Sequence, residues 1–183
     1  MKFKFFNHVA LMMCTVVLSV LMTSCKDKGN EPEPILPNKA SAVFMKFDFK
    51  AGTETMKVFD FTIDYYDNEG KVQTVVMADT AWTNTAKVAW PCKVGASVRI
   101  SLKNGVDVNT IDKARIEYSY NYLRYSTNAK DEVLGEVDSK GSESESSIKG
   151  EKINAFLAET DHIVQVLYSY DAEGKTTSLN TWE

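Results

Sequence analysis

Three tyrosines at every second position form the most suggestive chemical pattern in the sequence: Tyr118, Tyr120 and Tyr122. In an extended strand they share one face, while an acid, a serine and an amide share the other. Aromatic rings beside acids and amides suit carbohydrate binding, because rings stack on the apolar C–H faces of a sugar and polar neighbours bond to its hydroxyls. The tryptophans complete this candidate ligand-binding set: Trp82, Trp90 and Trp182. The alternative is that the rings pack in a core or an interface, since alternation does not tell which face is exposed.

Acidic residues gather in two similar turns, Asp64, Asp67 and Glu69 in the first and Asp171 and Glu173 in the second. Such carboxylates can ligate calcium or act as the acid–base pair of a glycosidase. Neither turn has the spaced acids and the terminal glutamate of the twelve-residue calcium loop. Solvated hairpin acids are the favoured interpretation, so we predict no metal site and no catalytic carboxylate.

Cys92 and His162 are the remaining catalytic possibility, as a nucleophile with its base. The sequence contains neither a glycine-rich phosphate loop nor a Gly-x-Ser-x-Gly elbow. Cys92 follows Trp90-Pro91 at a predicted strand end, where a small buried hydrophobe is the favoured interpretation. One cysteine and one histidine after Cys25 are also too few for a Cys/His zinc site. We therefore predict no catalytic residue, no cofactor and no enzyme activity.

An apolar run that stops at a cysteine, Leu21-Met22-Thr23-Ser24-Cys25, predicts where the protein sits. Two lysines precede an apolar stretch from about Val9 to Met22, which as a helix would span roughly 21 Å against a hydrocarbon core of about 30 Å. A positive start, a short apolar middle and small residues before the break are typical of a secretory signal. An ordinary signal peptide and an uncleaved anchor are the alternatives.

Ser24-Cys25 resembles the end of the lipobox of bacterial lipoproteins, in which a small residue precedes the acylated cysteine. The resemblance implies that residues 1–24 are a signal peptide, that the Cys25 thiol carries a diacylglyceryl group and that its freed amine is acylated. This number of acyl chains exceeds what stable anchoring needs. Lys26-Asp27-Lys28 is similar to the charged tag of Bacteroidota lipoproteins. It implies the outer membrane, with the cell-surface side favoured over the periplasmic side.

Composition limits the domain that follows the cysteine. The 159 residues from Cys25 onward are enough for one domain. The whole chain has a net charge of −4, and losing Lys2 and Lys4 makes it −6. This mild acidity argues against nucleic acid as a partner, because nucleic acid requires a basic stripe. With Cys25 lipidated, Cys92 has no partner for an internal disulfide, so the domain depends on its core.

Residues 25–41 are predicted to be a flexible tether, because three prolines among charged residues cannot build a helix or a central strand. From residue 42 the pattern changes to period two. Alternating runs enriched in β-branched and aromatic residues predict about eight strands. These are residues 43–49, 59–65, 72–78, 85–90, 97–103, 111–127 and 164–170, with a final strand ending near Trp182.

The strands predict a single all-β domain over residues 42–183, an antiparallel two-sheet sandwich, with a small β-barrel as the alternative. The stretch from Thr80 to Asn104 resembles small immunoglobulin-like lipoprotein domains, with a tryptophan near a strand start followed by a glycine turn. A polar segment near 128–150 is predicted to be a mobile loop. One short helix is expected at residues 152–159.

A repeated string, Tyr-Asp-x-Glu-Gly-Lys, occurs at residues 66–71 (with Tyr66-Asp67-Asn68) and again at 170–175. The favoured interpretation is one hairpin turn used twice, with Gly70 in the left-handed conformation, and a duplicated unit is the alternative.

The predicted function is that of a membrane-anchored, non-catalytic module that binds a glycan or a partner protein at the cell envelope. The alternative is a structural or assembly component of an envelope complex that contacts its neighbours through sheet edges.

Overall fold

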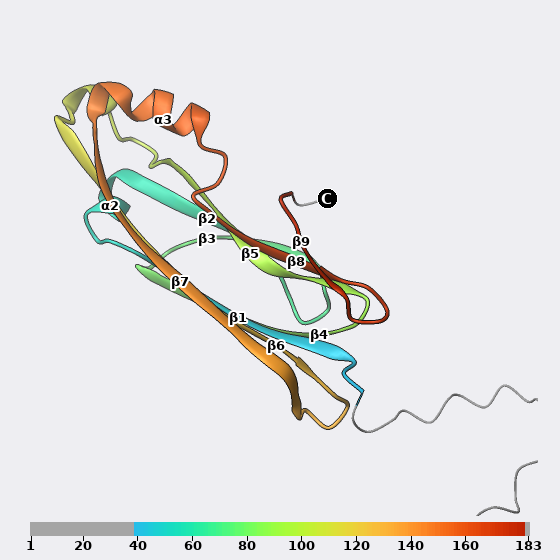
Figure 1. Cartoon of the computed structure of the whole chain (residues 1–183). Coiled ribbons are helices and arrows are strands. Elements are labelled where there is room, and N and C mark those ends of the chain that lie inside the picture. Colours follow the sequence, from blue (N-terminus) through green and yellow to red (C-terminus); the bar gives the residue numbers. More distant parts are fainter. Residues whose placement is uncertain (1–38, 182–183) are drawn as a thin grey trace, which may run out of the picture. The chain divides into compact units, whose positions relative to one another are not determined.

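Two antiparallel sheets packed face to face form the domain that the computed structural model describes, residues 39–181 (Figure 1). The strand order is β4-β1-β6-β7 in the first sheet, here sheet A, and β3-β2-β5-β8-β9 in the second, sheet B. The predicted two-sheet sandwich is confirmed, since each sheet has two edge strands of its own. The strands are β1 (Ala42–Ala51), β2 (Phe59–Tyr66), β3 (Val72–Val76), β4 (Ala81–Ala89), β5 (Cys92–Leu102), β6 (Lys113–Thr127), β7 (Val133–Lys149), β8 (Val164–Tyr170) and β9 (Thr176–Ser178).

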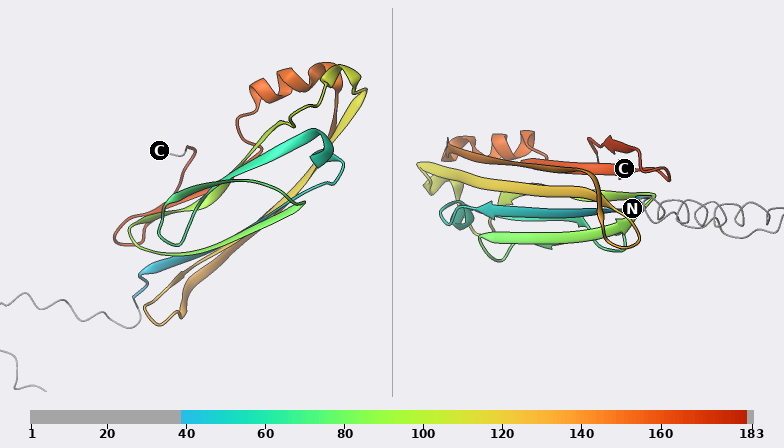
Figure 2. Two further views of the ribbon diagram at one scale, coloured as in Figure 1. Left: turned by 180° about the vertical axis from the view of Figure 1, so that it is seen from behind. Right: turned by 60° about the horizontal axis from the view of Figure 1, so that its bottom comes forward.

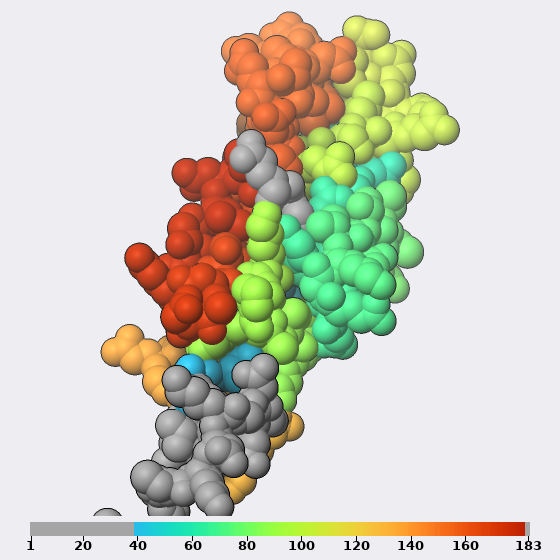
Figure 3. All heavy atoms as spheres, turned by 90° about the vertical axis from the view of Figure 1, so that its right-hand side faces the viewer, coloured from blue at the N-terminus to red at the C-terminus, as the bar shows by residue number. Residues whose placement is uncertain are grey.

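Helical elements are short and lie at strand ends. They are α2 (Thr55–Val58), α3 (Ile153–Glu159) and the 3₁₀ turns Val108–Thr110 and Gly150–Lys152. The short helix predicted near residues 152–159 is therefore confirmed. Figure 3 looks onto sheet B, where the red C-terminal hairpin, the yellow-green β5 and the teal β2–β3 hairpin lie side by side.

The distribution of the first strands between the sheets differs from that of an immunoglobulin domain. β1 lies between β4 and β6 in sheet A, and β2 belongs to sheet B. In an immunoglobulin domain the first two strands share a sheet. Figure 2 (right) shows the four strands of sheet A side by side, with β7 at one edge.

Alternation places the large apolar side chains between the sheets. β1 directs Phe47 and Phe49 inward, and both are almost completely buried. They meet the fully buried Phe59, Phe61 and Ile63 of β2, which sheet B presents from the opposite side. Since every second residue of a strand faces the same way, the alternating apolar runs of the sequence are sufficient to build this core.

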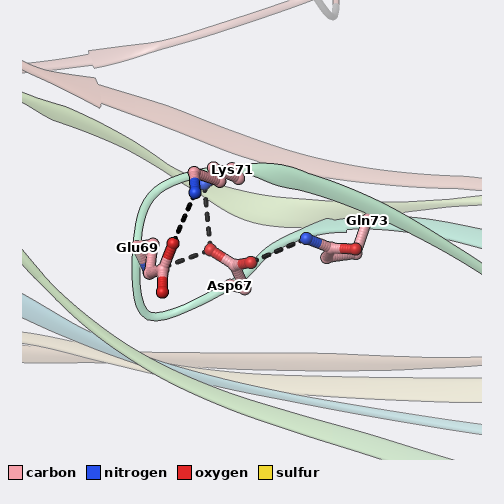
Figure 4. Close-up of polar contacts among 4 residues, drawn as sticks. All are labelled: Asp67, Glu69, Lys71 and Gln73. Carbon is pink, nitrogen blue, oxygen red and sulfur yellow. Dashed lines mark hydrogen bonds and ion pairs between the residues drawn. The ribbon is translucent and has the colours of Figure 1, made fainter.

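The first Tyr-Asp-x-Glu-Gly-Lys turn joins β2 to β3 (Figure 4). Asp67 Oδ1 accepts the backbone N–H groups of Glu69 at 2.8 Å and Lys71 at 2.9 Å. These hydrogen bonds, with the backbone N–H of Lys71 first among them, hold the pKa of the Asp67 carboxyl below its usual value. Gly70 has φ of 71°, as predicted, because the turn needs a left-handed residue there.

The second copy, between β8 and β9, repeats these contacts: Asp171 Oδ1 accepts from the N–H groups of Glu173 and Lys175. A third copy joins β6 to β7 with another sequence. There Asn128 Oδ1 accepts from the N–H groups of Lys130 and Glu132. Three uses of one turn in unrelated hairpins support common turn chemistry as the reason for the repeated string.

The predicted mobile loop near residues 128–150 is wrong, because most of it is strand β7. Val133–Lys149 pairs with β6 over nearly its full length, with one register shift near Arg124 and Ser126. The serines and glutamates that suggested disorder are those of an edge strand, most of whose side chains are exposed. Pairing with a well-ordered neighbour here overrides weak local β propensity.

Candidate functional site

The three tyrosines of β6 face sheet B. The Tyr118 ring stacks on Phe49 at 5.9 Å between centroids, and the Tyr120 ring stacks on Phe47 at 6.1 Å. Tyr122 is only 4% exposed. In the structure, this row of tyrosines therefore packs against the core. This is the alternative to an exposed platform that the sequence left open. Ligand contact by these rings stays a prediction.

Two of the predicted tryptophans also lie beside the core, at separate places. Trp82 on β4 contacts the rings of Phe47 at 6.4 Å and Tyr65 at 5.0 Å. Trp90 stacks on Tyr170 at 5.8 Å, near the hairpin of the C-terminal strands. Trp182 lies outside the described residues. The structure therefore brings Trp82 and the β6 tyrosines to one inner surface and places Trp90 elsewhere.

A polar cluster around Arg124 joins β6 and β7 to β8 between the sheets. The Arg124 guanidinium donates to Asp138 Oδ2 at 2.8 Å and to the Tyr170 hydroxyl at 2.7 Å. It lies 3.8 Å above the centre of the Tyr168 ring, whose hydroxyl is 2.9 Å from that of Tyr122. The hydrogen bond from Arg124 lowers the pKa of Asp138, and burial raises the pKa of Tyr122. This cluster fastens the edge strand to the opposite sheet.

The outer face of sheet A carries a depression with a volume of about 960 Å³. The depression is built from rows of residues that pair across the strands. One row contains a residue from each of the four strands: Thr83, Asp48, Asn121 and Gly141. The next row places Lys50 beside Ser119. Ala81 of β4 and Gly141 of β7 are among the small residues that line the depression. Hydroxyl, amide, carboxylate and ammonium groups surround it.

Polar groups around the depression are partly ordered before any ligand arrives. Asp48 accepts the Thr83 hydroxyl at 2.6 Å and pairs with Lys46 at 3.1 Å. Lys50 and Glu143 stand on opposite sides of Ser119 in the same row, since both pair in register with that residue. The depression therefore offers hydrogen-bond acceptors and donors side by side. Its two lysines, Lys46 and Lys50, balance the charge of its two acids, Asp48 and Glu143.

A stacked aromatic pair lies on the same outer face, two residues beyond Lys46 along β1. Phe44 and Tyr125 are cross-strand partners whose ring centroids are 4.6 Å apart at an angle of 13°. Both rings are half-buried. Tyr125 lies four residues from Asn121 on one strand, which is roughly 13 Å. The outer face thus combines an aromatic surface with hydrogen-bonding groups, the pairing first expected of the β6 tyrosines.

Sequence reasoning missed this surface for a specific reason. Phe44 alternates with the buried residues of β1, so the pattern assigns it to the polar side with Lys46 and Asp48. An aromatic residue at a position where a strand should carry polar groups was the signal. Tyr125 gave none by itself, because its pairing with Phe44 depends on the register of two strands distant in sequence.

The two residues considered as nucleophile and base lie at opposite ends of one strand pair. Cys92 pairs with Tyr170, and His162 precedes the other end, where Val98 pairs with Val164. Six residues along β5 separate these ends by about 20 Å. Burial raises the pKa of the Cys92 thiol to about 11. This pair cannot act as one catalytic unit.

The candidate acids take part in turns and in surface ion pairs. Asp64 accepts from Arg99 at 3.0 Å and from the Thr74 hydroxyl at 2.6 Å on the outer face of sheet B. Among residues 39–181, no three histidine, cysteine, aspartate or glutamate side chains come together as metal ligands. In that same part of the chain, no helix has the length and apolarity needed to cross a membrane.

Comparison of the chain with models of protein families, with curated proteins and with solved structures finds no match.

Proposed function

We propose that the chain is a non-catalytic binding module, held at the outer membrane by acyl groups on Cys25, that recognises a glycan through the outer face of sheet A. The observation that carries the proposal is the depression beside the Phe44–Tyr125 stack. A ring can stack on the apolar face of a sugar while its hydroxyls meet groups such as Asn121 and Asp48. The roughly 13 Å between Tyr125 and Asn121 favours a short oligosaccharide over a single ring.

The test is binding of the full chain, held in detergent, to an array of envelope and host glycans. Tyr125→Ala removes one ring of the stacked pair, and Asn121→Ala removes an exposed amide from the depression. Each is expected to weaken binding about tenfold, the effect of roughly 1.4 kcal/mol. The matched control is Gln165→Ala, because Gln165 carries an amide on the outer face of sheet B, pairing with Ser97. An array without binding, or equal losses in all three variants, contradicts the glycan proposal.

The anchoring part of the proposal depends on Cys25, which lies outside the described residues. Cys25→Ala should leave the protein without acyl chains, so it is expected in the soluble fraction after cell lysis instead of with membranes. Cys92→Ala is the matched control and should stay with the membranes. Sedimentation of the Cys25→Ala protein with membranes, as for the unchanged chain, would remove the lipid anchor from the account.

A further inference from the structure

Strand β7 leaves one edge of sheet A open along 17 residues. Within residues 39–181 it pairs with β6 alone. Every second residue of such a strand directs its backbone N–H and C=O groups away from the sheet. An edge of this length presents a row of unpaired hydrogen-bonding groups to any extended chain that reaches it.

The other edges of the two sheets are short or partly covered. β3 and β9 have 5 and 3 residues. β4 has 9 residues, but the turn between β2 and β3 reaches it, and Asn68 Oδ1 accepts the backbone N–H of Lys87 at 2.9 Å. Lys87 also pairs with Asp131. β7 has no comparable cover among the described residues, which singles it out as the edge able to accept a strand.

The side chains of β7 are suited to an added strand. On the face toward sheet B, Ser142 and Ser144 lie next to Tyr120 and Tyr118 across the pair with β6. These small side chains leave room for apolar side chains of a neighbouring strand close to the ring edges. On the outer face the strand carries Glu143 and Glu145, whose carboxylates would stand beside the partner's alternate residues.

The negative charge of β7 determines which kind of strand can pair with its edge. An antiparallel second copy centred on Ser144 would set Glu143 of each copy against Glu145 of the other, and like charges directly opposite are destabilising. A strand with lysine or arginine at alternate positions would instead place opposite charges beside Glu143 and Glu145, which stabilises the pairing. Arg115 already neutralises part of the charge, at 3.0 Å from Glu145 and 3.2 Å from Glu117. Glu143 has no such ion pair in the described part of the chain.

We propose that the β7 edge binds an extended segment of another protein in which basic and apolar residues alternate, adding a fifth strand to sheet A. Backbone hydrogen bonds supply the affinity in this mode of binding, and the alternating side chains supply the selectivity. This proposal goes beyond the glycan site, because it uses the backbone edge of β7, although Glu143 also borders the depression. Assembly of an envelope complex through a sheet edge is the alternative role predicted from the sequence, and this proposal assigns that contact to β7.

The probe is a blocked nine-residue peptide of alternating lysine and valine, added to the full chain in detergent. We expect saturable binding, measured by fluorescence anisotropy, and slower hydrogen exchange of β7 amides but not of β4 amides. A peptide of alternating glutamate and valine should bind at least about tenfold more weakly, because its carboxylates would stand beside those of Glu143 and Glu145. N-methylation of alternate backbone nitrogens in the lysine peptide should abolish binding, because an added strand needs those donors.

The double variant Glu143→Lys, Glu145→Lys should reverse the preference, binding the glutamate peptide more tightly than the lysine peptide. Its matched control is Glu69→Lys, Glu173→Lys, which makes the same change of net charge in two exposed turns and should keep the original preference. Equal weakening in both double variants, no binding of the lysine peptide, or protection away from β7 overturns the proposal. So does concentration-dependent self-association lost in Ser144→Pro, which would identify a second copy as the occupant.

Discussion

Replacing Phe49 with alanine is expected to lower the free energy of unfolding by about 3–5 kcal/mol. The Phe49 side chain is completely buried and contacts the rings of Phe61 at 5.5 Å and Tyr118 at 5.9 Å. Its removal would leave a cavity between the two sheets, beside Phe61 of β2 and Tyr118 of β6. The measurement is urea unfolding followed by tryptophan fluorescence.

The control for this prediction lies on the same strand. Phe44→Ala removes an identical side chain from the outer face, where the ring is half-buried and stacks on Tyr125. A cross-strand aromatic pair contributes up to about 1 kcal/mol, so we expect a loss of that order. Equal losses in Phe44→Ala and Phe49→Ala would mean that the assignment of inner and outer faces of β1 is wrong.

Replacing Arg124 with alanine is expected to cost about 2–3 kcal/mol at neutral pH. The side chain is 15% exposed, and its guanidinium holds Asp138 and the Tyr170 hydroxyl while covering the Tyr168 ring. Without it, the Asp138 carboxylate loses its charge partner in a half-buried place. We place the expected loss below that of a fully buried pair because Asp138 remains 26% exposed and water can reach it. The matched control is Arg115→Ala, which breaks the exposed ion pairs with Glu117 and Glu145 and should cost less than about 1 kcal/mol.

The Arg124→Ala loss should depend on pH. Arg124 lowers the pKa of Asp138 from its ordinary 3.8, so the pair contributes stability above that value and loses it as Asp138 takes up a proton. The difference between the unchanged chain and Arg124→Ala is therefore expected to be constant from about pH 5 to 7 and to shrink below about pH 4. A difference that stays the same down to about pH 2 would show that the arginine stabilises by packing alone.

Sequence pattern was sufficient for most of this fold because the buried strands carry their own signal. The alternating runs that form β1, β2, β6 and β8 each place large apolar residues on one face, which is the pattern of a half-buried strand. Two further predictions followed from local chemistry, the helix α3 and the left-handed Gly70. The final strand β9 ends at Ser178, four residues before the predicted end near Trp182.

Strand β7 could not be predicted from its own residues. Its central stretch of serines, glutamates and one glycine has low β propensity and little apolar surface. Its strand conformation depends on pairing with β6, whose long alternating run the sequence does show. Edge strands with both faces exposed lack the alternation that marks half-buried strands, so composition alone suggests a loop.

The aromatic residues illustrate the same limit at the level of a site. Tyr118 and Tyr125 belong to one strand, yet the first faces the core and the second faces outward because their positions differ by an odd number. Which of the two faces meets the other sheet is decided by the whole sandwich. The sequence therefore indicated that β6 carries an aromatic face and a polar face, and the structure adds the stacked pair on the polar one.

The central claim is that the outer face of sheet A is the surface that meets a ligand at the envelope, and lysine acylation tests it whatever that ligand is. Lys46 borders the depression, whereas Lys103 follows the end of β5 in sheet B. Their side chains are 45% and 46% exposed, so the two amines are a matched pair. Each acylation rate is measured in intact envelopes and divided by the rate for the purified chain. The account predicts a ratio for Lys46 several times lower than that for Lys103, and equal ratios would contradict it.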